Sequence, residues 1–165
     1  MNNPLKSLAV STALIAAFSF TAASSVLAAD SVKGEKIFKR CVGCHAVGPD
    51  AKKKVGPQLN GLLGRAAGVV ANYKYGTGII EARGEVGEDS DNDGYLDTPE
   101  GFAGLVWNED NLFEYLDDPQ KYIADYTKNP KARVKMRAFL KKEDQRKDVI
   151  AYLKTIGLDG NPIAQ

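Results

Sequence analysis

Histidine and cysteine are the scarcest metal-binding residues of this chain, and their scarcity excludes one common kind of site. The 165 residues include one histidine, His45, and two cysteines, Cys41 and Cys44. A structural zinc site normally takes four ligands of these two types. No other cysteine or histidine exists to complete such a site, so a zinc centre is excluded and the chemistry falls within one short motif, CVGCH.

The chain also lacks a large net charge and, after its N-terminal segment, a long apolar run. Its 22 basic and 21 acidic side chains argue against non-specific binding to nucleic acid. The apolar residues 8–20 follow Lys6 and precede the small residues VLAA at 26–29, as in a secretory signal peptide. A membrane anchor is the alternative, but the run is short and interrupted by polar residues. We expect residues 1–29 to be cleaved and residues 30–165 to form one exported, periplasmic domain.

Three explanations of CVGCH remain. A thioredoxin-like dithiol is expected to open a helix after a strand, whereas this motif closes a helical stretch and no strand precedes it. A structural disulfide gives no reason for the adjacent histidine. Covalent haem explains all three residues, because both thiols form thioethers with haem vinyl groups and His45 supplies a nitrogen to the iron. The motif therefore favours haem c, one per chain.

The sixth iron ligand is restricted by the same scarcity. After removal of the leader, the chain keeps one methionine, Met136, and no second histidine. The alternatives are His45/Met136 ligation and five-coordinate iron with an open position. Met136 could instead fill a gap in the core, but its charged flanks, RVKMRAF, indicate a loop that presents one side chain.

Apolar periodicity predicts an all-α domain of three to five helices with long loops. A first helix is expected after Asp30 or Ser31, with Gly34, Ile37, Phe38 and Cys41 on one face. A loop is expected over residues 46–68, followed later by a helix after Asn108, a short turn at residues 118–119 and a last helix over about 143–156.

The segment DSDNDGYLDTPE, residues 89–100, has the spacing of a calcium-binding EF-hand loop. Counted from Asp89, aspartates occupy positions 1, 3, 5 and 9, Gly94 is at position 6 and a glutamate is at position 12. The predicted calcium ligands are Asp89, Asp91, Asp93, the Tyr95 carbonyl, Asp97 and Glu100. A solvated acidic loop is the alternative, because glycine and proline surround the segment and flanking helices are not evident.

The chain resembles the class I cytochromes c, in particular the large-loop bacterial cytochrome c2 and c550 group. The resemblance spans nearly the whole mature chain. It is carried, in family order, by GEKIFKRCVGCH, VGPQLNGLLGR, LVWNEDNLFEYLDDPQKYI, DYTKNPKARVKM and KKEDQRKDVIAYLK. It implies a fold in which helices and long loops wrap around one covalent haem, and a function as an electron carrier rather than an enzyme.

The resemblance also implies roles for individual residues. His45 would be the proximal ligand, hydrogen-bonded to the Pro57 carbonyl, and Met136 the distal ligand. Arg65, Tyr75 and Trp107 would surround the haem propionates, and Tyr115 would lie near the methionine sulfur. Gly34 and Phe38 would pack against Tyr152 where the terminal helices cross. The family often has an aromatic residue where this chain has Ala138, and the chain carries an insertion at about residues 80–104.

The distribution of charge indicates how partners would dock. Residues 85–118 hold twelve acidic side chains and no basic one, and residues 121–147 hold ten basic and three acidic side chains. Lysines near the haem edge would attract an acidic redox protein such as a bc1-type complex, reaction centre, oxidase or dehydrogenase. The candidate lysines are Lys39, Lys52, Lys53, Lys54, Lys128, Lys131, Lys135, Lys141 and Lys142.

Overall fold

The computed structural model describes residues 29–137 and 139–163, and these residues form five α-helices. The helices are α1 (Ser31–Phe38), α2 (Thr77–Arg83), α3 (Glu109–Asp117), α4 (Pro119–Tyr126) and α5 (Glu143–Lys154). The described residues contain no extended strand and only three isolated β-bridges. The all-α prediction is confirmed, and the predicted signal peptide lies almost wholly outside the described residues.

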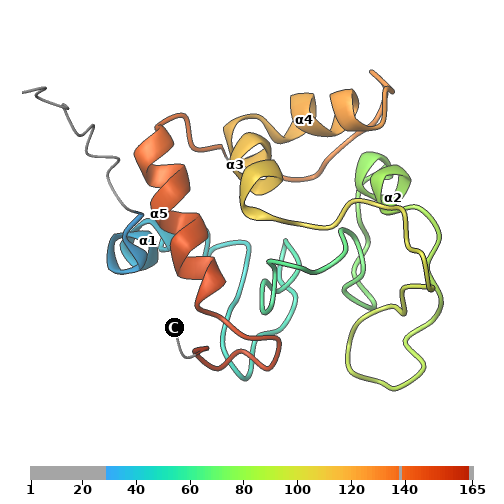
Figure 1. Cartoon of the computed structure of the whole chain (residues 1–165), viewed down its shortest axis with the longest axis horizontal. Coiled ribbons are helices and arrows are strands. Elements are labelled where there is room, and N and C mark those ends of the chain that lie inside the picture. The colour runs from blue at the N-terminus through green and yellow to red at the C-terminus, as the bar shows by residue number, and fades with distance from the viewer. Residues whose placement is uncertain (1–28, 138, 164–165) are drawn as a thin grey trace, which may run out of the picture.

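The two terminal helices, α1 and α5, cross and form the most extensive contact between helices (Figure 1). The Asp30 side chain caps α1 by accepting from the backbone N–H groups of Val32 and Lys33. A Cβ atom at Gly34 would lie only 1.9 Å from the Asp148 carbonyl oxygen, so the crossing requires glycine there. Phe38 lies 5.3 Å from Tyr152 between ring centroids. The predicted packing of Gly34 and Phe38 against Tyr152 is confirmed.

The first helix is shorter than predicted, and Cys41 does not belong to it. Helix α1 ends at Phe38, and the chain continues in tight turns through Cys41. Apolar periodicity extended the helix too far because Cys41 faces the core from a turn as well as it would from a helix. The last helix ends at Lys154, two residues before the predicted end.

Helices α3 and α4 meet at Asp118, which caps both of them. Asn108 and Asn111 form a reciprocal capping box at the start of α3. The Asp118 N–H donates to the Glu114 carbonyl at the end of α3, and its side chain accepts from the Lys121 N–H at the start of α4. The predicted turn at residues 118–119 is therefore the start of an eight-residue helix.

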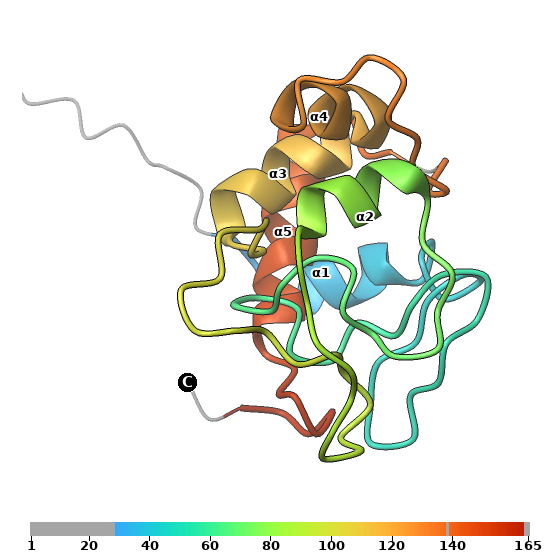
Figure 2. The ribbon, with the colours of Figure 1, turned by 90° about the vertical axis from the view of Figure 1, so that its right-hand side faces the viewer.

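Helix α2 was not predicted, and the expected insertion of residues 80–104 begins inside it. Glycine lies on both sides of this seven-residue helix, and its N-terminus has no side-chain cap, so its sequence carries no signal for a helix start. After α2, residues 84–108 form a long excursion that reaches the lower edge of the view (Figure 2). The insertion is thus a short helix followed by a loop.

The core lies between the helices and residues 57–70. Its fully buried side chains include Ile123 and Val149, and it also includes Phe38, Trp107, Tyr115 and Leu116. Cys41, Tyr75 and Met136 pack against this core from partly buried positions. Within residues 29–137 and 139–163, no helix has the length and apolar character that a membrane span requires.

Candidate haem site and the acidic loop

The CVGCH motif forms a compact turn that leaves both thiols free. The backbone N–H groups of Cys44 and His45 donate to the Cys41 carbonyl at 3.0 and 2.9 Å. Cys41 is partly buried and Cys44 is exposed, and no disulfide joins them. Burial raises the pKa of the Cys41 thiol, whereas a redox dithiol needs a lowered one. This arrangement suits thioether attachment better than thiol exchange.

His45 is held in one tautomer by residues 56–57. Its Nδ1 lies 2.8 Å from the Pro57 carbonyl oxygen, which can only accept, so Nδ1 carries the proton and Nε2 keeps a lone pair. Burial lowers the pKa of His45, although the Pro57 hydrogen bond opposes the effect, and the neutral form is favoured. A Cβ at Gly56 would come within 2.4 Å of the imidazole. The ring is therefore fixed with one nitrogen free to bind a metal.

The segment that carries Met136 is anchored on both sides. Before it, the Gly78 N–H donates to the Arg133 carbonyl and the Val134 N–H donates to the Gln120 side chain. After it, the Leu140 N–H donates to the Leu116 carbonyl at 2.7 Å. The Met136 side chain is partly buried against the core. Ala138, where the family often has an aromatic residue, lies outside the described residues.

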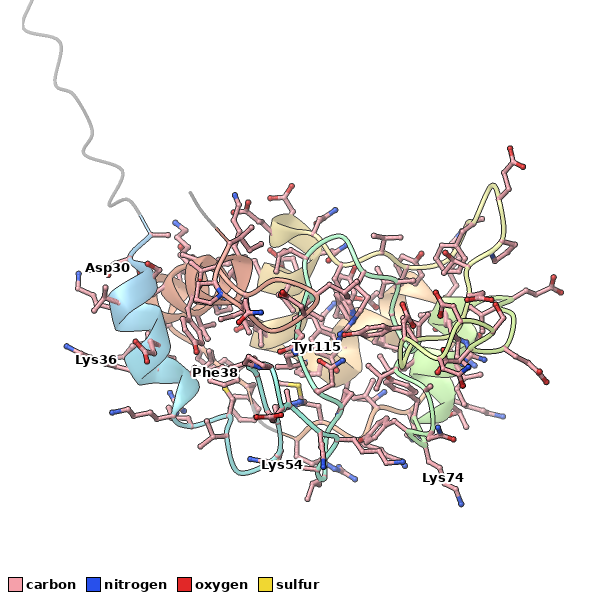
Figure 3. All side chains as sticks on the ribbon, turned by 90° about the horizontal axis from the view of Figure 1, so that it is seen from below. Asp30, Lys36, Phe38, Lys54, Lys74 and Tyr115 are labelled. Atoms are coloured by element: carbon pink, nitrogen blue, oxygen red, sulfur yellow. The ribbon has the colours of Figure 1, made fainter. Side chains whose placement is uncertain are left out.

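Three aromatic residues assigned by the resemblance lie in or beside the core. Trp107 is 7 % exposed and its ring centroid lies 4.8 Å from that of Tyr115. Burial raises the pKa of Tyr115, and it raises the pKa of Tyr75 to about 12. The Val70 N–H donates to the Tyr75 hydroxyl at 3.2 Å. Figure 3 shows Tyr115 well inside the molecule, with Lys54 and Lys74 at the lower edge of the view.

Arg65 is a cation whose hydrogen-bond partners are all uncharged. Its guanidinium donates to the carbonyls of Asn60 at 2.6 Å and Gln58 at 3.0 Å. Burial lowers its pKa, yet within the described part of the chain no carboxylate forms an ion pair with it. Arg65 is partly buried, and a cation withdrawn from water normally has an anionic partner. The residues present therefore fit a ligand with a negative group at this place, as the haem propionates would be.

The predicted calcium ligands are only partly brought together. Carboxylate oxygens of Asp89, Asp91 and Asp93 lie within 4.8 Å of one another. Gly94 has a φ of 93°, the left-handed conformation that a sharp turn requires at this position. Asp97 and Glu100 are not part of the three-carboxylate group. The flanking helices of an EF-hand are also lacking here, because α2 ends at Arg83 and α3 starts at Glu109.

Sequence reasoning missed a polar cluster beside Arg65. Gln58 and Asn60 are 9 % and 6 % exposed, and the Gln58 side chain donates to the Tyr95 hydroxyl at 2.5 Å. Tyr95 entered the prediction only through its backbone carbonyl. Residues 58 and 60 belong to the segment VGPQLNGLLGR, which carries part of the family resemblance. No spacing in the sequence, however, indicates that Gln58 contacts Tyr95, which lies 37 positions further on.

Comparisons with known proteins show which family the chain belongs to. The cytochrome c family profile matches residues 31–157. Cytochrome c2 iso-1 of Rhodospirillum centenum is 41% identical over 132 residues, covering 76% of this chain and 95% of that protein. Cytochrome c2 of Rhodospirillum rubrum is 32% identical over 143 residues, covering 87% and 93%.

Solved structures show the same relationship. The cytochrome c2 structure from Rhodospirillum centenum has a TM-score of 0.63 and 36% identity, covering 78% of this chain and 98% of that chain. Ferric cytochrome c-550 from Paracoccus versutus has a TM-score of 0.59 and 34% identity, with coverage of 78% and 98%. With a family match over residues 31–157 and relatives at 32–41% identity, the chain belongs to the cytochrome c family.

Proposed function

We propose that this chain is a periplasmic one-electron carrier in which Cys41 and Cys44 would hold a covalent haem and His45 and Met136 would bind its iron. Membership of the cytochrome c family supports the covalent haem and the electron-carrier role. The observation that carries the proposal is the turn at residues 41–45, which presents two free thiols beside an imidazole with an unprotonated nitrogen.

The haem supplies a one-electron ferric/ferrous couple, and the protein sets its environment. The Pro57 carbonyl orients the His45 ring and makes its other nitrogen, Nε2, more basic and so a stronger metal ligand. The anchored segment before and after Met136 presents a thioether, which favours the ferrous state more than a second nitrogen ligand does. The apolar core penalises the extra positive charge of the ferric state. If His45 and Met136 both held the iron, no position would be left for a substrate, so we propose an electron carrier and not an enzyme.

The first experiment tests the haem itself. The chain is expressed in a periplasm that attaches c-type haem, and the purified protein is run on a denaturing gel stained for haem. A coloured band that survives denaturation and disappears in the Cys41→Ala/Cys44→Ala variant is expected. A colourless protein with a titratable pair of thiols supports the dithiol alternative and contradicts the proposal.

The proposed redox partners are acidic proteins that dock at exposed lysines. The partners expected for a cytochrome c2 relative include a bc1-type complex, a photosynthetic reaction centre, an oxidase or a periplasmic dehydrogenase. All nine candidate lysines are exposed. Lys53, Lys54 and Lys135 donate to backbone carbonyls and Lys141 pairs with Asp117 at 3.4 Å, so the others are freer to meet a partner. Docking of this kind is weak, fast and sensitive to salt.

The acidic loop supports a second part of the proposal, a calcium site in the insertion. Three carboxylates converge at Asp89, Asp91 and Asp93, and clustered negative charges repel one another unless a cation is bound. The carbonyl of Tyr95 and the carboxylates of Asp97 and Glu100 would complete the ligand set if the loop closed around the ion.

Isothermal titration with calcium tests this site, with magnesium as the comparison ion. Heat of binding and a rise in melting temperature are expected for the wild type and not for Asp89→Asn/Asp93→Asn. No heat and no shift in melting temperature at millimolar calcium would show that the loop is a solvated acidic segment. The haem proposal does not depend on this result.

A further inference from the structure

The inserted segment places Tyr95 at a fixed position beside residues 69–71. Val70 and Tyr95 form an antiparallel β-bridge. The Leu96 N–H donates to the Val69 carbonyl at 2.7 Å, and the Ala71 N–H donates to the Gly94 carbonyl at 2.8 Å. Although it belongs to a long loop, Tyr95 is thus held by backbone hydrogen bonds on both sides.

The Tyr95 hydroxyl uses its full hydrogen-bonding capacity. It accepts from Gln58 Nε2 at 2.5 Å and from Arg65 Nη1 at 3.4 Å, and it lies 3.5 Å from the Asn60 carbonyl, to which it can donate. A phenol offers one donor and two acceptor positions. The hydroxyl therefore links Gln58, Asn60 and Arg65, three polar residues that follow Pro57 in the sequence.

The Tyr95 ring also contacts the Arg65 cation. The Arg65 Cζ atom lies 5.2 Å from the ring centroid, within the range of a cation–π interaction. Together with the two carbonyl acceptors, the phenol fixes the guanidinium without neutralising it. The positive charge is thereby kept in place and left available to an anionic group.

The same contacts reach the segment that orients His45. Gln58 follows Pro57, whose carbonyl accepts from the imidazole. The Asn60 N–H donates to the Gln58 side chain at 2.6 Å, and Arg65 donates to the carbonyls of both residues. Tyr95 therefore braces the 58–60 segment as well as the cation beside it.

Without the Tyr95 hydroxyl, the Arg65 guanidinium could adopt another orientation. A surface cavity of about 650 Å³ is lined by Arg65 and Tyr95 and also by Asp93 and Asp97. A guanidinium released from the hydroxyl could turn toward either carboxylate or toward water. Either movement would weaken the field of its charge in the interior, because water and counter-charges screen it.

From these contacts we propose that Tyr95 is a positioning residue that holds the Arg65 cation at the haem site and thereby raises the reduction potential. The inference rests on the proposed electron-carrier function. Ferric haem carries one more positive charge than ferrous haem, so a fixed nearby cation disfavours the ferric form. The insertion would then supply a residue that sets the redox property of the protein.

The test is a double-variant cycle read as equilibrium reduction potential. The haem-loaded wild type, Tyr95→Phe, Arg65→Gln and the double variant are titrated at one pH and one salt concentration. Tyr95→Phe keeps the ring and removes the hydroxyl. Tyr126→Phe is the matched control, because Tyr126 is exposed on α4 and belongs to none of these contacts.

A lower potential is expected for Tyr95→Phe and for Arg65→Gln, with the double variant equal to Arg65→Gln alone and Tyr126→Phe equal to the wild type. If Arg65→Gln does not accumulate, Arg65→Lys replaces it, and the Tyr95→Phe shift should then be smaller than in the wild type. An unchanged potential in Tyr95→Phe, even with a lower melting temperature, would overturn the proposal. Additive shifts in the double variant would also overturn it, since Tyr95 would not act through Arg65. Failure of the electron-carrier function itself would be visible earlier, as a wild type without a reversible couple.

Discussion

At the residue scale, two glycines determine how closely other groups approach. Gly34 lets α5 lie directly against α1, and Gly56 lets the backbone pass beside the His45 ring. A methyl group at either position would overlap neighbouring atoms, at 1.9 Å in the first case and 2.4 Å in the second. Glycine is therefore required at both positions because a larger side chain does not fit, and not because of its backbone flexibility.

Gly34→Ala should destabilise the protein. Alanine favours a helix over glycine by up to ~1 kcal/mol, but overpacking at a closed contact costs about 1–3 kcal/mol, and here the obstacle is the Asp148 backbone. Denaturant unfolding of the haem-loaded protein measures the difference. Lys36→Ala, on the exposed side of the same helix, should change stability by less than about 0.5 kcal/mol. Equal stability of Gly34→Ala and the wild type would show that the helices can separate at no cost.

Stability should fall in alkaline solution because Tyr75 resists ionisation in the folded protein. Burial raises the pKa of Tyr75 to about 12, against about 10 in an unfolded chain. The contribution is complete below pH ~10 and is lost as the pH rises toward about 12, because the unfolded state ionises first. Two units correspond to roughly 3 kcal/mol at most. Unfolding free energies measured from pH 8 upward should decline less steeply in Tyr75→Phe, whereas parallel curves would contradict the assignment.

Single residues were the most predictable part of the site. The attachment motif, the hydrogen bond of His45 to Pro57 and the contact of Phe38 with Tyr152 follow from short motifs whose partners have known positions in the family. The contact of Tyr95 with Gln58 and Arg65 could not be predicted in this way. It depends on the path of an insertion, and neither periodicity nor spacing specifies that path.

At the element scale, helix boundaries follow from their caps. Asn108 was correctly expected to start a helix, whereas Asp118 was expected only in a short turn and in fact also starts one. Each side chain accepts from a backbone N–H three residues later. Helix α2 escaped prediction because it has no such cap and is held by packing, with a Cβ at Gly78 coming within 2.7 Å of Ile123. Where tertiary contact replaces a local signal, the sequence alone does not reveal the helix.

Asn108→Ala should weaken the start of α3 by about 1 kcal/mol, the usual cost of losing an N-cap. The Asn108 side chain accepts from the Asn111 N–H at 2.8 Å, and the Asn111 side chain accepts in return at 2.9 Å. Thermal unfolding of the haem-loaded protein measures the loss. Asn108→Asp keeps the acceptor and should remain close to the wild type. A loss of equal size in both variants would mean that the cap is not the cause.

At the scale of the whole molecule, charge is segregated along the chain while its sum is small. The acidic residues 85–118 include the inserted loop, and the basic residues 121–147 surround Met136. We expect the two segments to favour partners of opposite charge. The rate at which this protein associates with an acidic protein should depend on the exposed candidate lysines and not on its net charge.

Lys52→Gln/Lys131→Gln should slow electron transfer to an acidic partner such as a photosynthetic reaction centre. Both lysines are exposed, and removing steering charges lowers the association rate most at low ionic strength. Stopped-flow or flash kinetics over a salt series would show a several-fold loss at low salt that disappears at high salt. Lys36→Gln, an exposed change on α1, is the control. Equal slowing by the control would indicate that only net charge matters.

The most direct test of the central claim is the optical spectrum of the purified haem-loaded protein, recorded oxidised and then reduced under carbon monoxide. Ligation by Met136 predicts the weak long-wavelength band of a methionine–iron bond in the oxidised protein, absent from Met136→Ala, and a reduced spectrum that carbon monoxide does not change. If the wild type lacks that band and its reduced form binds carbon monoxide readily, the iron has an open position. The chain would then be a haem enzyme or a small-ligand-binding haem protein, and the account of an electron carrier would be wrong.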